Sequence, residues 1–148
     1  MPLERRLALL RPFLMFTGAA CLALPILTRV WPEAWMWEPR QPEYEQMIIG
    51  VYVTLGVFVL LASRDPLRHL SLIWFTAWSS LVHGGIMLIQ ALRDPLERAN
   101  LVGDIPALLL VGIGLIVLTP RARDLAKDRP WARRPHSARR WRPGTWRR

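Results

Sequence analysis

The sequence predicts an all-α fold, a bundle of four transmembrane helices followed by a disordered basic C-terminal tail. Long apolar segments occupy most of residues 1–120, where nine basic side chains balance nine acidic ones. Residues 121–148 have eleven basic and two acidic side chains, so the tail carries the whole net charge of +9. This separation of apolar and charged residues excludes a disordered protein, a disulfide scaffold and an ordinary soluble enzyme.

Four apolar segments of residues 1–120 account for the predicted spans. A helix needs roughly 20 apolar residues to cross the ~30 Å hydrocarbon core of a bilayer. Backbone groups inside lipid must pair with each other, so these segments are expected to be helices. The second and fourth are somewhat short, and their flanks would lie in the membrane interface. The expected helices cover about residues 12–30, 45–62, 67–92 and 101–119.

The first segment has some features of a cleaved signal peptide. Two arginines precede it, and Gly18–Cys21 resembles a lipoprotein cleavage site. The apolar run continues past this point to Leu27, whereas a cleaved hydrophobic region ends near the cut. We therefore expect a retained helix with a kink at Pro25.

The third and fourth segments each follow the same four-residue motif, Arg-Asp-Pro-Leu. The copies are Arg64–Leu67 and Arg93–Leu96. Aspartate is favoured at a helix N-cap, and proline is favoured at the first helical position. The motif therefore predicts two helix starts. Convergent use of a good start explains the two copies more simply than an internal duplication does.

The distribution of basic residues predicts the orientation. The N-terminal segment, the loop between the second and third helices and the tail together carry sixteen basic residues, against four in the other two loops. The more basic side of a membrane protein usually faces the cytoplasm. We therefore expect both termini in the cytoplasm, with the protein in a bacterial inner (plasma) membrane.

The first outer loop is rich in tryptophan. Trp31, Trp35 and Trp37 fall within seven residues. Tryptophan is enriched where a membrane protein meets the headgroups, so a belt at the outer interface is the favoured interpretation. An aromatic cage that binds a ligand is the alternative.

Polar and small residues form one face of the third predicted helix. Thr76, Ser80 and Gly84 are spaced by four, and Gly85 widens this surface, so another helix can approach closely. Packing therefore explains the serines and glycines. His83 differs, because a titratable side chain near mid-membrane is costly and usually faces the interior of the bundle.

His83 is the centre of a predicted polar pocket that opens outward. Glu45, Gln90 and Asp104 are expected near the outer surface, and Tyr52 and His83 about 10 Å deeper, two helical turns away. The alternatives are a neutral His83 bonded to a serine or to Tyr52 for structural reasons, a binding or proton-relay site, and a metal or haem site. The predicted pocket residues are Glu45, Tyr52, Ser80, His83, Gln90 and Asp104.

No metal, cofactor or catalytic residue is predicted. Haem in a helix bundle usually takes two axial ligands from facing helices, and His69 is about 21 Å from His83 along one helix. Ser79 or Ser80 with His83 would be a conceivable nucleophile and base, but the sequence places no orienting acid beside them. An enzyme is therefore the less favoured class.

The tail is expected to bind lipid. A basic cluster next to a membrane helix attracts anionic headgroups, and tryptophans insert at the same level. Nucleic acid or an acidic protein partner is less favoured, and Arg121–Arg129 is expected to extend the fourth helix by a turn or two. The predicted lipid-surface residues are Arg121, Arg123, Trp131, Arg133, Arg134, Trp141 and Trp146.

Three groups of residues between Tyr44 and Pro120 form a recognisable pattern. They are Glu45 with Gly50-x-Tyr52-x-x-Leu55-Gly56, then Asp65-Pro66-x-x-x-His69-x-Ser71-Leu72-Ile73, then Trp78-Ser79-Ser80-x-x-His83-Gly84. This pattern resembles a family of small bacterial four-helix membrane proteins of unknown function. The resemblance implies the architecture and draws attention to Glu45, His69 and His83, but it implies no activity.

Two functions are compatible with these features. The favoured hypothesis is an accessory or assembly subunit of a membrane complex, with a membrane-protein partner. The alternative is a small oligomeric transporter or sensor that uses the pocket around His83. Both require the lipid bilayer as the protein's environment.

Overall fold

The computed structural model describes residues 1–36, 41–121 and 124–125, and these residues are helical almost throughout. No strand occurs among them, which confirms the all-α prediction. The four α-helices are α1 (Leu3–Val30), α2 (Pro42–Arg64), α3 (Leu70–Arg93) and α4 (Asp104–Leu118). Three 3-10 helices connect them: η1 (Pro32–Ala34), η2 (Pro66–His69) and η3 (Pro95–Val102).

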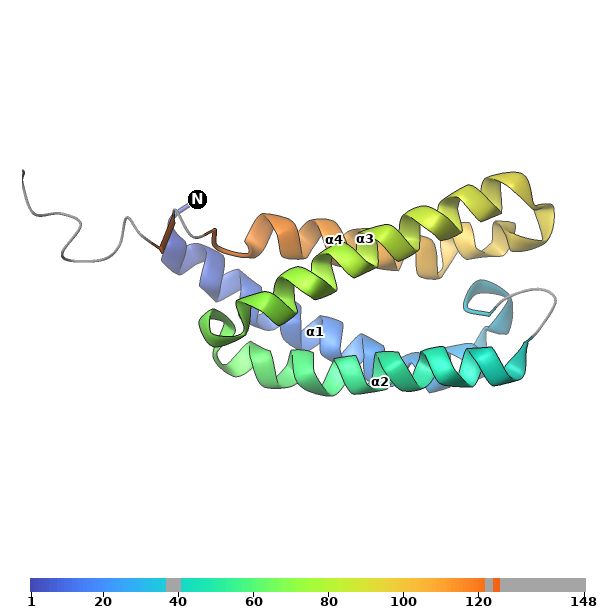
Figure 1. Cartoon of the computed structure of the whole chain (residues 1–148), viewed down its shortest axis with the longest axis horizontal. Helices are drawn as coiled ribbons and strands as arrows, with labels where there is room; N and C mark the ends of the chain where they lie inside the picture. The colour runs from blue at the N-terminus through green and yellow to red at the C-terminus, as the bar shows by residue number, and fades with distance from the viewer. Residues whose placement is uncertain (37–40, 122–123, 126–148) are drawn as a thin grey trace, which may run out of the picture.

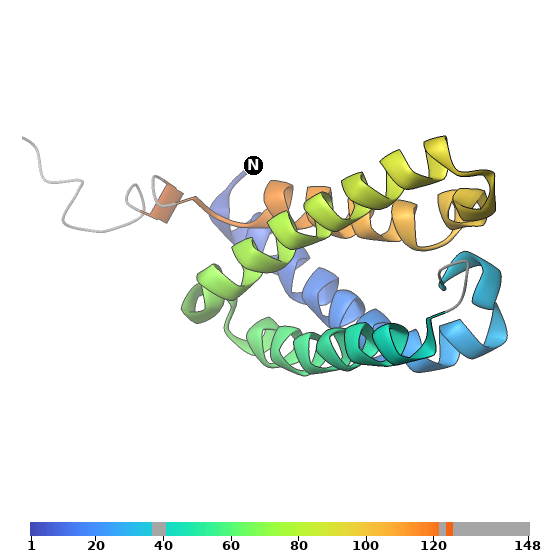
Figure 2. The ribbon, with the colours of Figure 1, turned by 45° about the vertical axis from the view of Figure 1, so that its right-hand side comes forward.

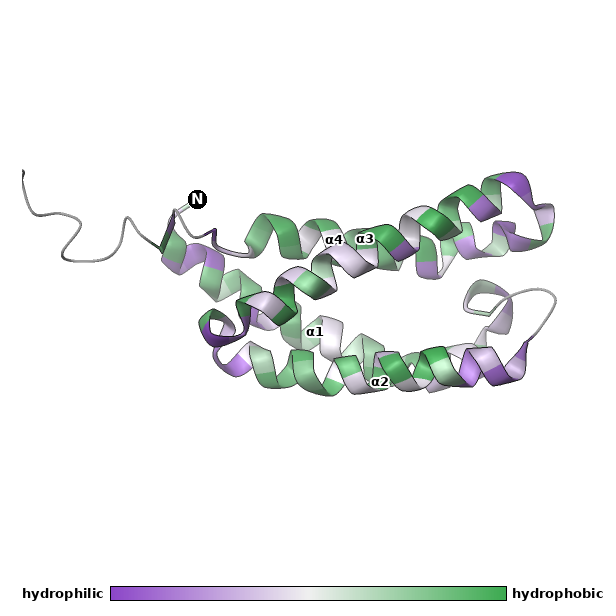
Figure 3. Ribbon diagram, viewed as in Figure 1, coloured by the Kyte–Doolittle hydropathy of each residue, from purple (hydrophilic) through white to green (hydrophobic). Residues whose placement is uncertain are grey.

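In the described part of the chain, three helical segments are long and apolar enough to cross a membrane, namely α1, α2 and the continuous segment of η2 and α3. A fourth span exists if η3 and α4, which are bent by 49° at the break between them, count as one. α4 alone has 15 residues and is roughly 22 Å long, which is shorter than the hydrocarbon core. The predicted continuous helix over 101–119 is therefore wrong at its start, where Gly103 breaks it. Apolar residues follow the lengths of the helices, and hydrophilic residues gather at their ends (Figure 3).

α1 begins nine residues earlier than the sequence predicts, at Leu3 rather than residue 12. The predicted helix starts where the apolar segment starts, after the arginines that precede Pro12. Arginine has a high helix propensity, so they continue the helix beyond the apolar part. Pro12 and Pro25 both lie inside α1.

The two Asp-Pro motifs start helices, but of the 3-10 type. Asp94 acts as the predicted N-cap, because its carboxylate accepts a hydrogen bond from the Leu96 amide at 2.9 Å. Asp65 makes no such bond, and its carboxylate lies 3.4 Å from Arg68 Nε instead. The N-cap position is therefore confirmed for both aspartates, but only Asp94 makes the side-chain capping bond.

The helices form two hairpins, α1 with α2 and α3 with α4 (Figures 1 and 2). We call the end with the N-terminus and η2 the terminal end, and the end with η1 and η3 the loop end. At the terminal end, one buried cluster contains residues of all four helices: Leu10, Leu14, Val59, Ile73, Ala77 and Leu115. A second cluster contains only α3 and α4 residues: Met87, Ala91 and Ile105. The α-helices of the two hairpins therefore pack together at the terminal end and diverge toward the loop end, where η1 still contacts η3.

Glycines allow the helices of each hairpin to approach closely. A Cβ atom built on Gly56 would lie 2.9 Å from the Gly18 carbonyl oxygen of α1, and one on Gly84 would lie 3.1 Å from Leu108 Cβ of α4. The predicted small-residue face of α3 is thus confirmed at Gly84. Gly85 was expected to widen this face, but a Cβ there would have no neighbour within 4 Å.

The chain leaves α4 at Leu118, followed by Thr119 and the buried Pro120. Arg121 is exposed and not helical, so the predicted extension of the helix through Arg121 is wrong, because Pro120 cannot donate a helical hydrogen bond. Arg6 holds this segment against α1, with Nη1 2.7 Å from Asp124 Oδ2 and Nη2 donating to the Val117 carbonyl at 3.0 Å. The other predicted lipid-surface residues, Arg123, Trp131, Arg133, Arg134, Trp141 and Trp146, lie outside the described residues.

Candidate functional site

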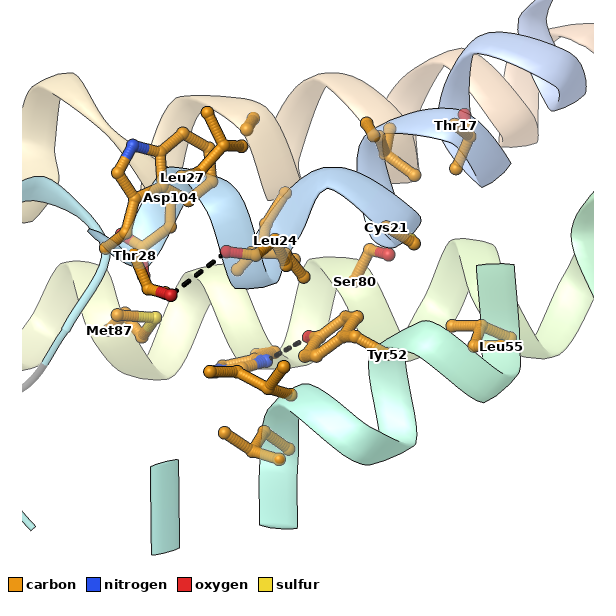
Figure 4. A pocket seen from close by; sticks show the side chains of 18 of the residues that line it. Thr17, Cys21, Leu24, Leu27, Thr28, Tyr52, Leu55, Ser80, Met87 and Asp104 are labelled. Atoms are coloured by element: carbon orange, nitrogen blue, oxygen red, sulfur yellow. Dashed lines mark hydrogen bonds between the residues drawn. The ribbon is translucent and has the colours of Figure 1, made fainter. Parts of the chain in front are cut away.

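A cavity of about 140 Å³ lies between the two hairpins, where they diverge (Figure 4). All four α-helices line it, together with the segment of η1. Its walls are mainly apolar, with Leu24 from α1, Ile48 and Leu55 from α2, Met87 from α3 and Val111 from α4. The fold thus produces a site to which each of the four α-helices contributes.

Five of the six residues predicted for the polar pocket line this cavity: Glu45, Tyr52, Ser80, His83 and Asp104. They come from α2, α3 and the start of α4. Gln90 is exposed and is not among the lining residues. It lies two turns beyond His83 toward the loop end, where α3 is separated from the other hairpin (Figure 1).

Glu45 is a buried carboxylate in the first turn of α2. The residue is 5% exposed, and its Oε1 accepts a long hydrogen bond from the backbone N–H of Gln41 at 3.4 Å. Its Oε2 is buried and has no hydrogen-bond partner among the described residues. Burial of an unpaired carboxylate oxygen costs free energy, so a bound group that donates a hydrogen bond would be favoured here.

Asp104 provides a second carboxylate as the first residue of α4. Its Oδ1 is likewise buried, without a hydrogen-bond partner in the part of the chain that the structure describes. Both acidic residues occupy helix N-termini, where the helix dipole favours negative charge. The cavity therefore contains two carboxylates, each supported by a helix start.

Tyr52 and His83 connect the two hairpins across the cavity. The Tyr52 hydroxyl oxygen lies 2.5 Å from His83 Nδ1 and shares a hydrogen bond with it (Figure 4). The two rings are stacked, with their centroids 5.9 Å apart. A hydrogen bond between His83 and Tyr52 is one of the alternatives predicted from the sequence.

The contribution of α1 to the cavity was not predicted. Thr17, Cys21, Leu24 and Thr28 all line it. Their spacing of three or four residues places them on one face of the helix, and this signal was available in the sequence. The first helix was interpreted only as a retained anchor or a signal, so its polar face was missed.

The tryptophan-rich loop has two different roles in the structure. Trp31 is 48% exposed, as an interface belt requires. Trp35 instead lines the cavity, which the belt interpretation does not predict, because η1 folds back between the hairpins. Trp37 lies outside the described residues.

The polar groups of the cavity are suited to holding a solute. The described residues that line it include no lysine or arginine. Among the described residues, no group of three or more His, Cys, Asp or Glu side chains could hold a metal ion. The Ser79 hydroxyl donates to the Thr76 carbonyl at 3.2 Å, and His83 Nδ1 is bonded to Tyr52. The cavity thus offers acidic and hydrogen-bonding groups to a bound molecule.

The Tyr52–His83 hydrogen bond should contribute measurably to stability. We expect Tyr52→Phe to lower the free energy of unfolding, and to cost less when His83→Leu has already removed the partner. Interhelical hydrogen bonds in membranes average about 0.6 kcal/mol and reach roughly 1.7 kcal/mol, so the coupling should fall in this range. A double-mutant cycle of reversible unfolding in mixed micelles measures it.

Tyr44 provides the matched control, because it lies on the same helix and is 59% exposed. Tyr44→Phe should change the free energy of unfolding little, in either background. Equal effects of Tyr52→Phe with and without His83 would contradict an energetic role for the bond.

The comparisons with known proteins identify a family and no activity. The pattern of a family of unknown function, DUF6632, matches residues 5–137. This match includes α1 and much of the tail, so it covers more of the chain than the resemblance between Tyr44 and Pro120. No curated protein and no solved structure matches the chain. From the match over most of its length, the chain belongs to the family of unknown function DUF6632.

Proposed function

We propose that the protein is a membrane-embedded solute-binding protein, a small transporter or sensor that holds its solute in the cavity around His83. The observation that carries the proposal is the convergence of acidic and hydrogen-bonding side chains from different helices on one cavity. Polar and ionisable residues within membrane helices are costly and generally mark a pathway or a site. Structural packing alone does not account for the two unpartnered carboxylate oxygens.

The proposed orientation places the terminal end in the cytoplasm. Arg5, Arg6 and η2 with Arg68 lie at this end, as does Arg121, from which the basic tail continues. The opposite end carries Arg29 and Arg93. Under the positive-inside rule, the cavity would therefore face the outer side of a bacterial inner membrane, and the tail would contact anionic lipids of the cytoplasmic leaflet.

The accessory-subunit hypothesis stays a prediction. It requires a stoichiometric partner when the protein is purified from native membranes in mild detergent. Purification as a homo-oligomer would favour the solute-binding proposal instead.

Filling the cavity should weaken solute binding strongly. Ala107 lines the cavity on α4, whereas Leu110 of the same helix is 60% exposed. We expect Ala107→Phe to weaken binding at least tenfold and Leu110→Phe to leave it unchanged, since the same ring then points away from the cavity.

The measurement uses purified protein in lipid nanodiscs, with empty nanodiscs as background. Radiolabelled benzylamine, benzyl alcohol and benzoate serve as a cationic, a neutral and an anionic probe of one size. Protection of Cys21, which lines the cavity, from N-ethylmaleimide is a second readout. The proposal is overturned if no probe binds the wild type above background, or if both variants bind like the wild type.

A further inference from the structure

We infer that the cavity selects a small organic cation, an ammonium group attached to a ring-sized apolar body. This inference rests on the proposed function and specifies the chemical class of the solute. It follows from the charges, the unpartnered atoms and the size of the cavity.

Two acidic side chains face the cavity. Glu45 and Asp104 are acidic, and the described lining residues include no lysine or arginine to neutralise them. An opposite charge within a few ångströms in a medium of low dielectric interacts far more strongly than in water. A cation is therefore favoured in the cavity and an anion is repelled.

The unpartnered oxygens define what the cation must supply. Glu45 is 95% buried, and within residues 1–36, 41–121 and 124–125 both its Oε2 and Asp104 Oδ1 lack a hydrogen-bond partner. An ammonium group donates up to three hydrogen bonds and accepts none, so it can satisfy acceptors that have no donor. Charge-assisted hydrogen bonds of this kind are roughly twice as strong as neutral ones.

The helix dipoles do not reverse this preference. α2 and α4 both begin at the loop end, and a helix N-terminus by itself favours an anion. In this protein, Glu45 and Asp104 already place a carboxylate at each of these N-termini. An anionic solute would therefore meet a carboxylate at each of these helix N-termini.

The walls fit an organic rather than an inorganic cation. A volume of about 140 Å³ is close to the ~150 Å³ of an engineered apolar cavity that accepts benzene, and the walls carry side chains such as Leu24 and Ile48. The aromatic residues Trp35 and Tyr52 also line the cavity. Aromatic faces attract ammonium groups, so they add to the preference for a cation with an apolar body.

Binding of benzylamine, benzyl alcohol and benzoate to the full-length protein in nanodiscs tests this inference at neutral pH, where benzylamine is a cation. We expect wild-type protein to bind benzylamine at least tenfold more tightly than benzyl alcohol, and benzoate most weakly. The variant Glu45→Gln keeps the shape of the side chain but removes its charge. It should weaken benzylamine binding about tenfold or more and leave benzyl alcohol unchanged.

Glu43→Gln is the matched control, because Glu43 is exposed in the same first turn of α2 and does not line the cavity. It should bind benzylamine as the wild type does. Asp104→Asn is a second test of the charge at another helix, and size-exclusion profiles establish that each variant is folded.

The outcomes distinguish the inference from the proposed function. Equal binding of benzylamine and benzyl alcohol, unaffected by Glu45→Gln but abolished by Ala107→Phe, would overturn the cation preference and retain a solute-binding cavity. Tightest binding of benzoate would overturn it in favour of an anion site. Binding of none of the three probes would overturn both.

Discussion

Replacing Gly56 with alanine is expected to destabilise the protein by about 1–3 kcal/mol, the usual cost of overpacking a close contact. The added Cβ would lie 2.9 Å from Cys21 Cβ and 2.9 Å from the Gly18 carbonyl oxygen, both on α1. Neither atom is the end of a flexible side chain, so the backbones of α1 and α2 must separate. The change also acts on the cavity, because Cys21 and Leu55 line it beside this contact.

Gly50 provides the matched control on the same helix. A Cβ at Gly50 has no neighbour within 4 Å, so Gly50→Ala meets no obstacle. Alanine is favoured over glycine in a helix by up to about 1 kcal/mol, so this variant should be unchanged or more stable. In mixed micelles, Gly56→Ala should lower the free energy of unfolding, whereas Gly50→Ala should leave it unchanged or raise it. Destabilisation of equal size would indicate that glycine flexibility, rather than the close approach of α1, determines the effect.

The sequence predicts the helices of this fold better than their ends. Long apolar runs are a strong signal, because the length of a membrane span is set by the bilayer. The start of α1 differs from the prediction because the helix continues through arginines that lie outside the apolar run. The break at Gly103 was missed because it depends on a contact with Ala34, a residue nearly seventy positions earlier in the chain. Such contacts leave no periodic signal.

The site was predictable where helical spacing determines it. Glu45 and Tyr52 are seven residues apart and share a face of α2, and both line the cavity. Gln90 satisfies the same spacing relative to His83, yet it is exposed. Spacing fixes the face of a helix, but it does not fix how far two hairpins diverge along their length. The divergence follows from a core that includes all four helices only at the terminal end.

The contact between Gly103 and Ala34 is expected to control access to the cavity. A Cβ built on Gly103 would overlap the Ala34 carbonyl oxygen and lie 2.7 Å from Ala34 Cβ. Ala34 is fully buried at the end of η1, and the next two residues, Trp35 and Met36, line the cavity. The contact therefore holds the segment that forms the cavity wall against η3.

Gly103→Ala should displace this segment and expose Cys21. The overlap would destabilise the arrangement in which η1 packs against Gly103 by about 1–3 kcal/mol. The equilibrium would then shift toward displacement of η1 by roughly 5–150-fold. We expect the rate of Cys21 alkylation by N-ethylmaleimide to rise at least about fivefold in nanodiscs. The rate reports the cavity directly, because Cys21 is the protein's single cysteine.

Gly85→Ala is the control for this variant, since a Cβ there meets no atom within 4 Å. It should leave the alkylation rate of Cys21 unchanged. Gly103→Ala with a lowered free energy of unfolding but an unchanged alkylation rate would show that the strain is absorbed elsewhere in the fold. A faster rate together with weaker benzylamine binding would instead indicate that η1 completes the binding site, because Trp35 would have moved away with it.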